Sequence, residues 1–185
     1  MDKWNIIDHT FKYRIGDSDE KGGCTFIGGE WVDIDTNQLF KGKKVFITGH
    51  TGFKGSWLAL WLNHLGSEVA GFSVNIPNTP SNFELLRLDQ HLRHYVGDIR
   101  DRDCLATVID DFKPDIVFHL AAQALVRSSY ADPVTTFETN IMGMVNLLEC
   151  VRARPSISAA VLITSDKAYR NVEWCWGYRE TDALG

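Results

Sequence analysis

Three glycines, Gly49, Gly52 and Gly55, stand three residues apart between an apolar run and a segment of helical periodicity. Glycine allows a sharp turn and lets phosphate approach backbone N–H groups, which a Cβ atom would obstruct. Strand, glycines and helix in this order bind a dinucleotide pyrophosphate at the helix N-terminus. We predict that the loop contacts the dinucleotide through Gly49, Thr51, Gly52, Phe53 and Gly55. Lys54 either contacts phosphate or is solvated, and His50 is expected to shape the loop.

A second run that can do chemistry is Ser165-Asp166-Lys167, which follows the apolar segment 159–164. Its hydroxyl, carboxyl and amine can hydrogen-bond a substrate oxygen and transfer protons. An aspartate and a lysine after a strand are equally consistent with a solvated ion pair. On residue types alone, both interpretations stand.

Alternating strand and helix patterns must position these two runs. Apolar segments predict a strand before Gly49 and further strands at 68–74, 94–96, 115–122 and 159–164. Helices are predicted at 54–65 and 82–88, after Asp101, and from the cap Asp132-Pro133 onward. The alternation indicates right-handed crossovers and an α/β fold, a Rossmann-like, doubly wound parallel sheet of about five strands.

Two of these helices carry apolar residues at helical spacing, a pattern that normally marks the face packed on a core. In helix 54–65 they are Trp57, Leu58, Trp61, Leu62 and Leu65. After Pro133 they are Val134, Phe137, Ile141, Val145 and Leu148. His119, which lies inside an apolar strand, is expected to be a core histidine rather than a ligand.

Ligands of such sheets bind at the carboxyl ends of the strands, so the residues there are candidate cofactor contacts. Asn75 follows the second strand, where an acid usually binds ribose hydroxyls, and no arginine stands beside it to favour NADP. Asp98-Ile99 follows the third strand, and Asp98 either contacts adenine or caps a turn. Ala121-Ala122-Gln123 follows the fourth, and its small side chains either admit a ribose or serve packing. Thr164 ends the fifth.

The composition is that of an ordinary globular protein. The net charge of −5 argues against a nucleic-acid or anionic-membrane binder. No apolar run is long enough for a membrane span, and no signal peptide is visible. Four scattered cysteines show neither zinc nor disulfide spacing, so we expect reduced thiols in a cytoplasmic protein without a metal. Residues 1–38 form a polar extension with a predicted hairpin of 25–27 and 30–32, and residues 39–185 form the dinucleotide-binding domain.

The motifs together resemble a known family. Gly49-x-x-Gly52-x-x-Gly55, Asp98-Ile99, His119-Leu120-Ala121-Ala122-Gln123 and Asn140 resemble the extended short-chain dehydrogenase/reductases that act on nucleotide sugars. More narrowly, the runs GHTGFKGSWL, GDIRD, FKPDIVFHLAAQALVR, ITSDKAY and WGYRE are similar to the 4,6-dehydratases of CDP-glucose. Ser165-Asp166-Lys167 is the most specific part, because other nucleotide-sugar 4,6-dehydratases usually carry Asp-Glu there. The resemblance runs from about Asn37 to Gly185.

This resemblance implies tightly bound NAD, with Asn140 among the residues that bind it, and a hydro-lyase that converts CDP-glucose to its 4-keto-6-deoxy product. The sugar is oxidised at C4, loses water across C5 and C6, and receives hydride at C6. By the same resemblance, Ser165 hydrogen-bonds the C4 oxygen, Asp166 is the general acid at the C6 hydroxyl, and Lys167 removes the C5 proton. A homodimer paired through helices of this half is also implied.

One departure from the family is serious. Its members carry a Tyr-x-x-x-Lys pair and a C-terminal substrate domain beyond this point, whereas here Glu173 follows Tyr169 and Asp182 follows Tyr178 at the lysine position. General-base catalysis contributes about 10²–10⁴-fold in rate, so we expect an N-terminal portion that binds NAD and is itself nearly inactive. Two alternatives stay open, a non-catalytic dinucleotide-binding module and a related nucleotide-sugar epimerase or reductase. The Asp-Lys pair disfavours an epimerase, which needs no acid at C6.

Overall fold

The computed structural model describes residues 13–14, 24–27, 30–33 and 36–185. Near the N-terminus, β1 (Tyr13–Arg14), β2 (Cys24–Ile27) and β3 (Glu30–Asp33) form an antiparallel sheet. Ile27 pairs with Glu30, and Cys24 with Asp33, so the predicted hairpin is confirmed. A short helix, α1 (Thr36–Phe40), then leads into the main domain.

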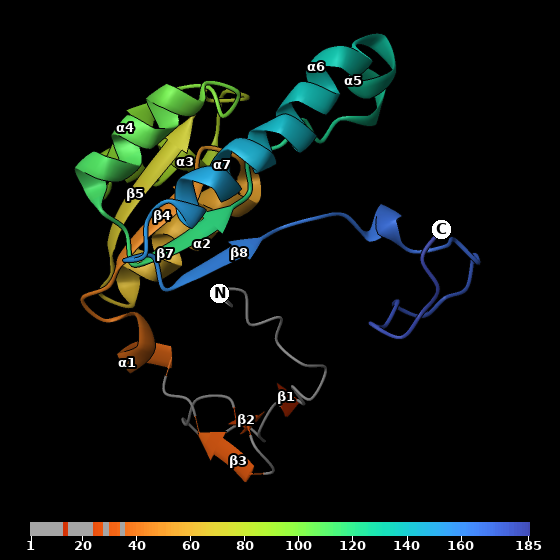
Figure 1. The fold of residues 1–185 in the computed structure, drawn as a ribbon, viewed down its shortest axis with the longest axis horizontal. Coiled ribbons are helices and arrows are strands. Elements are labelled where there is room, and N and C mark those ends of the chain that lie inside the picture. The colour runs from red at the N-terminus through yellow and green to blue at the C-terminus, as the bar shows by residue number, and fades with distance from the viewer. Residues whose placement is uncertain (1–12, 15–23, 28–29, 34–35) are drawn as a thin grey trace.

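The main domain is built on a parallel sheet of five strands (Figure 1). They are β4 (Lys44–Thr48), β5 (Glu68–Ser73), β6 (Arg93–Val96), β7 (Ile116–His119) and β8 (Ala159–Leu162). Their spatial order is β6-β5-β4-β7-β8, and each neighbouring pair is parallel. From β4 the chain adds β5 and β6 on one side of the sheet. It then crosses back and adds β7 and β8 on the other side of β4. This order confirms the doubly wound Rossmann-like prediction, with β4 and β7 at the reversal.

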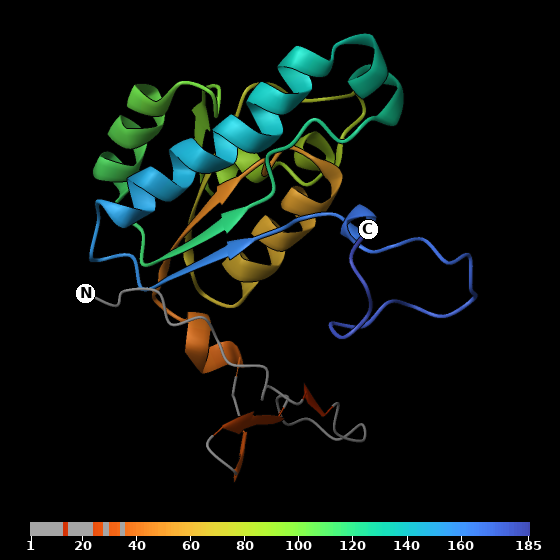
Figure 2. The ribbon, with the colours of Figure 1, turned by 45° about the vertical axis from the view of Figure 1, so that its right-hand side comes forward.

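Helices cover both faces of this sheet (Figures 1 and 2). One face carries α2 (Phe53–His64), α3 (Asn82–Leu85) and the turn η1 (Leu88–Gln90), and the other carries α4 (Arg102–Phe112) and α7 (Gly143–Arg152). Successive strand residues point to opposite faces, so Phe46 packs on the α4 side while Val45 and Ile47 pack on the α2 side. Two buried cores result, one on each side of a sheet that is apolar on both faces.

Local signals fix where several helices begin. Asp101 accepts a hydrogen bond from the Cys104 backbone N–H at 3.0 Å at the start of α4. Asp132 accepts one from the Thr135 N–H at 3.1 Å, with Pro133 as the first helical residue of α6 (Pro133–Phe137). Both starts were predicted, because these caps satisfy N–H groups that the helix itself leaves unpaired.

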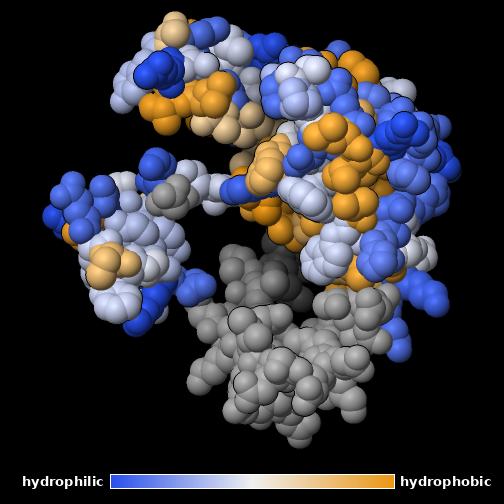
Figure 3. Space-filling model, turned by 180° about the vertical axis from the view of Figure 1, so that it is seen from behind, coloured by the Kyte–Doolittle hydropathy of each residue, from blue (hydrophilic) through white to orange (hydrophobic). Residues whose placement is uncertain are grey.

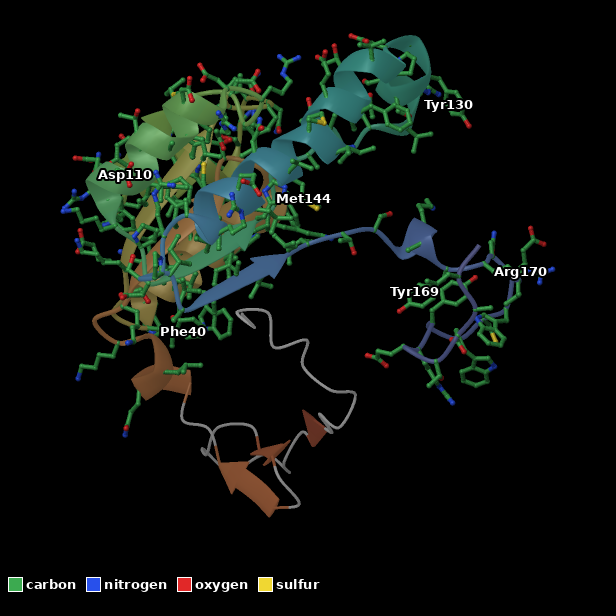
Figure 4. All side chains as sticks on the ribbon, viewed as in Figure 1. Phe40, Asp110, Tyr130, Met144, Tyr169 and Arg170 are labelled. Carbon is green, nitrogen blue, oxygen red and sulfur yellow. The ribbon has the colours of Figure 1, made fainter. Side chains whose placement is uncertain are left out.

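The region between β7 and β8 is less regular than predicted. An extra helix, α5 (Val126–Ala131), precedes α6, and Tyr130 lies at its far tip (Figure 4). Between α6 and α7 the turn η2 (Glu138–Met142) is π-helical. The apolar face predicted here is largely exposed: relative exposure is 66% for Val134, 62% for Phe137, 50% for Ile141 and 43% for Val145.

A similar correction applies to α2. Trp57 and Trp61 share the helical spacing of Leu62 and Leu65, but they are 50% and 52% exposed, whereas Leu62 is fully buried and Leu65 nearly so. The buried stripe also contains Gly55, Ser56 and Ala59. These small residues let the helix lie close to the sheet, which turns the large indoles outward. Figure 3 views this side of the molecule and shows hydrophobic side chains at its surface.

After β8 the chain forms a short turn, η3 (Asp166–Ala168), and then a closed loop. Tyr169 pairs with Leu184 in an antiparallel bridge, and the Arg170 N–H donates to the Ala183 carbonyl at 2.8 Å. Inside the loop the rings of Tyr169 and Tyr178 stack, with centroids 5.2 Å apart. Figure 4 shows Tyr169 and Arg170 in this segment, apart from the sheet.

Candidate functional site

The glycine loop joins β4 to α2 and has no room for side chains at two of its three glycines. Gly49 has φ +77°, and a Cβ atom on it would lie 2.7 Å from the Ala121 nitrogen. A Cβ on Gly55 would lie 2.2 Å from the Gly49 carbonyl oxygen. Gly52 is the N-cap of α2, and no side chain caps this helix end. The backbone N–H groups of the first turn are therefore available to an anion, as dinucleotide binding requires.

Successive residues of this loop are each tied to the end of β5. The Gly49 N–H donates to the Phe72 carbonyl at 2.8 Å. Next along the chain, His50 Nδ1 lies 3.2 Å from Ser73 Oγ. The Thr51 hydroxyl donates to the Asn75 carbonyl at 2.7 Å. Three hydrogen bonds from consecutive loop residues thus set the position of the loop relative to β5.

A cavity of about 360 Å³ opens at the carboxyl ends of β4, β5, β6 and β7. It lies beside the reversal of strand order, where open α/β sheets bind ligands. The predicted residues that line it are Gly49, Thr51, Gly52, Asn75, Asp98, Ile99, Ala121, Ala122 and Gln123. Four other predicted residues, Phe53, Gly55, Asn140 and Thr164, are not part of its lining. The contacts of all thirteen with a cofactor remain predictions.

The cavity also contains residues that sequence reasoning missed, above all Arg100. Both guanidinium edges are occupied: Nη2 lies 2.7 Å from Asp98 Oδ2, and Nη1 lies 3.2 Å from Glu138 Oε2. The hydrogen bonds from Arg100 lower the pKa of the Asp98 carboxyl, because they stabilise its charged form. No arginine adjoins Asn75 in sequence, yet the fold puts one in the same cavity. Thr135 and Thr139, from the helical segment after Asp132, line it as well.

Asn140 holds the wall of the cavity rather than facing into it. Its Oδ1 accepts a hydrogen bond from the Gln123 N–H at 2.8 Å, and its Nδ2 donates to the Gln123 carbonyl at 3.0 Å. The Gln123 side chain in turn donates to the Thr136 hydroxyl at 3.1 Å. One amide therefore fixes the backbone that follows β7, where small alanines line the cavity.

His119 is a core histidine, as predicted. It is 2% exposed, and its Nδ1 lies 2.7 Å from Thr48 Oγ1. That same hydroxyl oxygen accepts from the Ala121 N–H at 3.2 Å. Burial lowers the pKa of His119, so the ring is neutral at pH 7. Its function is to connect β4 and β7 beneath the cavity.

Of the acid–base candidates, Ser165 precedes the turn η3 and Lys167 lies in it, and neither belongs to the cavity lining. Ser165 Oγ accepts a hydrogen bond from the Lys167 N–H at 3.1 Å, which shapes the turn. Both side chains are exposed. The Asp166 side chain lies outside the described part of the structure, so its predicted role is not tested by geometry.

Among the described residues, no three His, Cys, Asp or Glu side chains are grouped in a way that could hold a metal ion. Within the same part of the chain, no helix combines the length and apolar character needed to cross a bilayer. Of the cysteines whose side chains are described, Cys104, Cys150 and Cys175 are free thiols.

Comparison with known proteins identifies the family. A family described as GDP-mannose 4,6 dehydratase matches residues 46–181, which is most of the chain. The chain belongs to this family. CDP-glucose 4,6-dehydratase of Salmonella typhimurium is 54% identical over 152 residues, a match that covers 82% of this chain and 42% of the relative. GDP-mannose 4,6-dehydratase of Vibrio cholerae is 36% identical over 121 residues, covering 60% and 31%. The chain thus spans less than half the length of these relatives.

Solved structures of nucleotide-sugar epimerases have the same fold as this chain. UDP-glucose 4-epimerase from Stenotrophomonas maltophila, solved with bound NAD and formylated UDP-arabinopyranose, superposes with a TM-score of 0.68 at 27% identity, covering 77% of this chain and 43% of that one. UDP-glucose 4-epimerase from Thermus thermophilus, in complex with NAD, gives 0.67 at 29% identity, covering 77% and 44%. This family member therefore shares the fold of less than half of each of those enzymes.

Proposed function

We propose that this chain is the NAD-binding portion of a CDP-glucose 4,6-dehydratase. The single observation that carries the proposal is the 54% identity to the Salmonella CDP-glucose 4,6-dehydratase, well above the 36% to the GDP-mannose enzyme. The name of this relative supplies the substrate, CDP-glucose. The cavity at the strand ends supplies a place for the cofactor.

The residues at this cavity fit NAD. Cβ atoms at Gly49 or Gly55 would clash with the backbone of the loop and of the segment after β7, so glycine is required for the loop to pack this closely. The start of α2 has no side-chain cap, so a pyrophosphate can approach its backbone N–H groups. Asn75 is exposed at the end of β5, where it can hydrogen-bond a ribose hydroxyl. Asp98 accepts from Arg100 and lines the adenine side of the cavity, and Ala121 and Ala122 leave space for the nicotinamide ribose. When bound, NAD takes up hydride from C4 of the sugar and returns it to C6.

The protein's own residues then handle protons and water. Ser165 hydrogen-bonds the C4 oxygen as it becomes a ketone, and the tyrosine of the family's Tyr-x-x-x-Lys pair takes the proton of the C4 hydroxyl. The ketone makes the C5 proton acidic. Lys167, in its neutral form, removes that proton, and Asp166, in its protonated form, donates to the C6 hydroxyl as it leaves as water. These roles require the turn after β8 to meet the sugar at the mouth of the cavity.

Two measurements test the proposal. Isothermal titration of the 185-residue chain with NAD should show saturable binding. A protein that continues to the full length of its relatives should convert CDP-glucose, and neither UDP-glucose nor GDP-mannose, to a 4-keto product seen by its absorbance in alkali. The chain alone should show no turnover, since Glu173 and Asp182 stand where the family's lysine would follow a tyrosine. Equal turnover of GDP-mannose would contradict the CDP assignment.

We further propose that the protein forms a homodimer through the exposed apolar stripe of α6, η2 and α7. The stripe contains Val134, Phe137, Ile141 and Val145, each at least 43% exposed. Apolar residues at helical spacing on a free helix face are typical of a helix–helix interface. Ile141→Glu should shift the mass measured by light scattering from dimer to monomer, while the exposed Leu85→Glu on the opposite face should not.

A further inference from the structure

His50 is the one loop residue whose side chain is fully buried yet titratable, among the described residues 49–55. It is 0% exposed and does not line the cavity. Its Nε2 lies 2.7 Å from His94 Nδ1 on β6, and its Nδ1 lies 3.2 Å from Ser73 Oγ at the end of β5. The imidazole therefore joins the glycine loop to two neighbouring strands at once.

The sheet is shaped to accept this ring. A Cβ atom at residue 71 would lie 2.1 Å from His50 Cγ, so only glycine fits in β5 opposite the imidazole. Phe83 of α3 packs edge-on against His50, with centroids 5.3 Å apart, and also against His94 at 5.0 Å. His50 is thus enclosed by Gly71 and Phe83, and the exposed His94 packs against the same aromatic ring.

At the 2.7 Å contact one ring nitrogen must donate a hydrogen bond and the other must accept it, so the accepting imidazole has to be neutral. Burial, helped by His94, lowers the pKa of His50 to about 3. Burial also lowers the pKa of His94, although Asp89 of η1 acts in the opposite direction. Ser73 from β5 and Phe83 from α3 carry no charge. At pH 7 both rings are therefore neutral, and one N–H is shared between Nε2 and Nδ1.

We infer that His50 and His94 are positioning residues, which hold the glycine loop against the ends of β5 and β6 in the geometry that binds the dinucleotide pyrophosphate. The inference rests on the proposed NAD-binding function of the loop. Ser73 connects the pair to the cavity, because it both lines the cavity and contacts His50. Binding at the cavity and the state of the His50–His94 pair are consequently coupled, although neither imidazole lines the cavity.

The test uses the chain itself, with NAD titrated by calorimetry and the imidazole nitrogens followed by ¹⁵N NMR. His94→Leu removes the partner of His50 and should raise the NAD dissociation constant about fivefold, the loss expected for one hydrogen bond. His94→Gln keeps a hydrogen-bonding group and should recover most of the affinity. His91→Leu, at an exposed histidine three residues earlier, is the matched control and should bind like the unmodified chain.

The NMR readout separates positioning from a merely structural role. In the unmodified chain, addition of NAD should shift the His50 and His94 nitrogen signals and leave those of exposed His91 unchanged. Unshifted His50 and His94 signals on saturation with NAD, or a His94→Leu variant that binds NAD as tightly as the control, would overturn the inference. A chain that binds no NAD at all would overturn the proposed function together with it, and calorimetry distinguishes the two failures.

Discussion

The glycine loop carries the proposed cofactor binding, and the segment after β8 carries the proposed acid–base chemistry. The loop is fixed by contacts with the sheet, whereas the segment is fixed by contacts within itself. His50 and Thr51 are 0% and 4% exposed, whereas Trp176 is 75% exposed. The loop is hydrogen-bonded to the sheet at consecutive residues, while the later segment closes on itself through Tyr169 and Leu184. Cofactor binding, as proposed, depends on contacts that this sheet provides. The acid–base run depends on a loop with its own internal contacts.

The sharpest test of that contrast is Asp166→Asn in a protein of the relatives' full length. Loss of the general acid should lower the dehydration rate by about 10²–10⁴-fold, because an amide cannot protonate the departing hydroxyl. The reduced cofactor formed at C4 oxidation should accumulate, seen by its absorbance in single turnover. NAD affinity should not change. Glu180→Gln, an exposed acid of the same segment, serves as the control. A normal rate in the Asn variant would remove Asp166 from the mechanism.

Alanine substitutions compare the two regions directly. At Gly55 the new Cβ would lie 2.2 Å from the Gly49 carbonyl oxygen, whereas at Gly177 nothing lies within 4 Å. Gly55→Ala should weaken NAD binding by on the order of a hundredfold, because the loop must open to relieve the contact. Gly177→Ala should leave both NAD affinity and melting temperature unchanged. Equal effects of the two substitutions would mean that the backbone around Gly55 is packed no more tightly than the backbone around Gly177.

Acid should destabilise the side of the molecule that contains the glycine loop. The folded-state pKa of His50 is about 3, against 6.5 for the free group, so the unfolded chain takes up a proton first as the pH falls below 6.5. The free energy of unfolding should then decrease by up to about 1.4 kcal/mol per pH unit between those two values. Urea titrations at pH 7.5 and 4.5 measure the slope, to which His94 and His119 add. His50→Gln should have a shallower slope, and an unchanged one would contradict the assignment.

The smallest of these effects concerns the wall held by Asn140. Asn140→Ala removes two hydrogen bonds to the Gln123 backbone and should lower stability by about 1–2 kcal/mol, with a matching loss of NAD affinity. Asn78→Ala removes an exposed bond to Pro80 and should have little effect on either quantity. Thermal melts with and without NAD would show the difference. No change in the Asn140 variant would mean that the wall is held by other contacts.

Local chemistry explains which parts of the fold could be predicted. The caps at Asp101 and Asp132, and the glycines after β4, act within a few residues, so their positions follow from sequence alone. The continuous apolar runs of β4 and β7 likewise indicate a strand buried on both faces. These features place the strand ends, and hence most of the cavity lining.

What could not be predicted depends on contacts between distant segments. Arg100 enters the cavity because Asp98 and Glu138 hold it there, and Glu138 lies 38 residues away in sequence. Trp57 and Trp61 have the spacing of a buried face. The small residues on the neighbouring face, Gly55, Ser56 and Ala59, allow α2 to lie closer to the sheet, and that face is the buried one. Helical periodicity shows that a helix has an apolar face. It does not show which of two adjoining faces packs against the sheet.

The π-helical turn Glu138–Met142 has a consequence for how this protein tolerates insertions and deletions. Such a turn amounts to one extra residue within an α-helix. The wide turn absorbs that residue, so deleting one residue here would restore a regular α-helix and leave the buried face of α7 where it is. Each helical residue rotates the chain by about 100°, so inserting one more residue would turn α7 by that angle relative to α6. Leu147 and Cys150, now 0% and 3% exposed, would then leave the core. Changes of length should therefore be accepted in the loop around Gly177, whereas this turn should accept a deletion and reject an insertion.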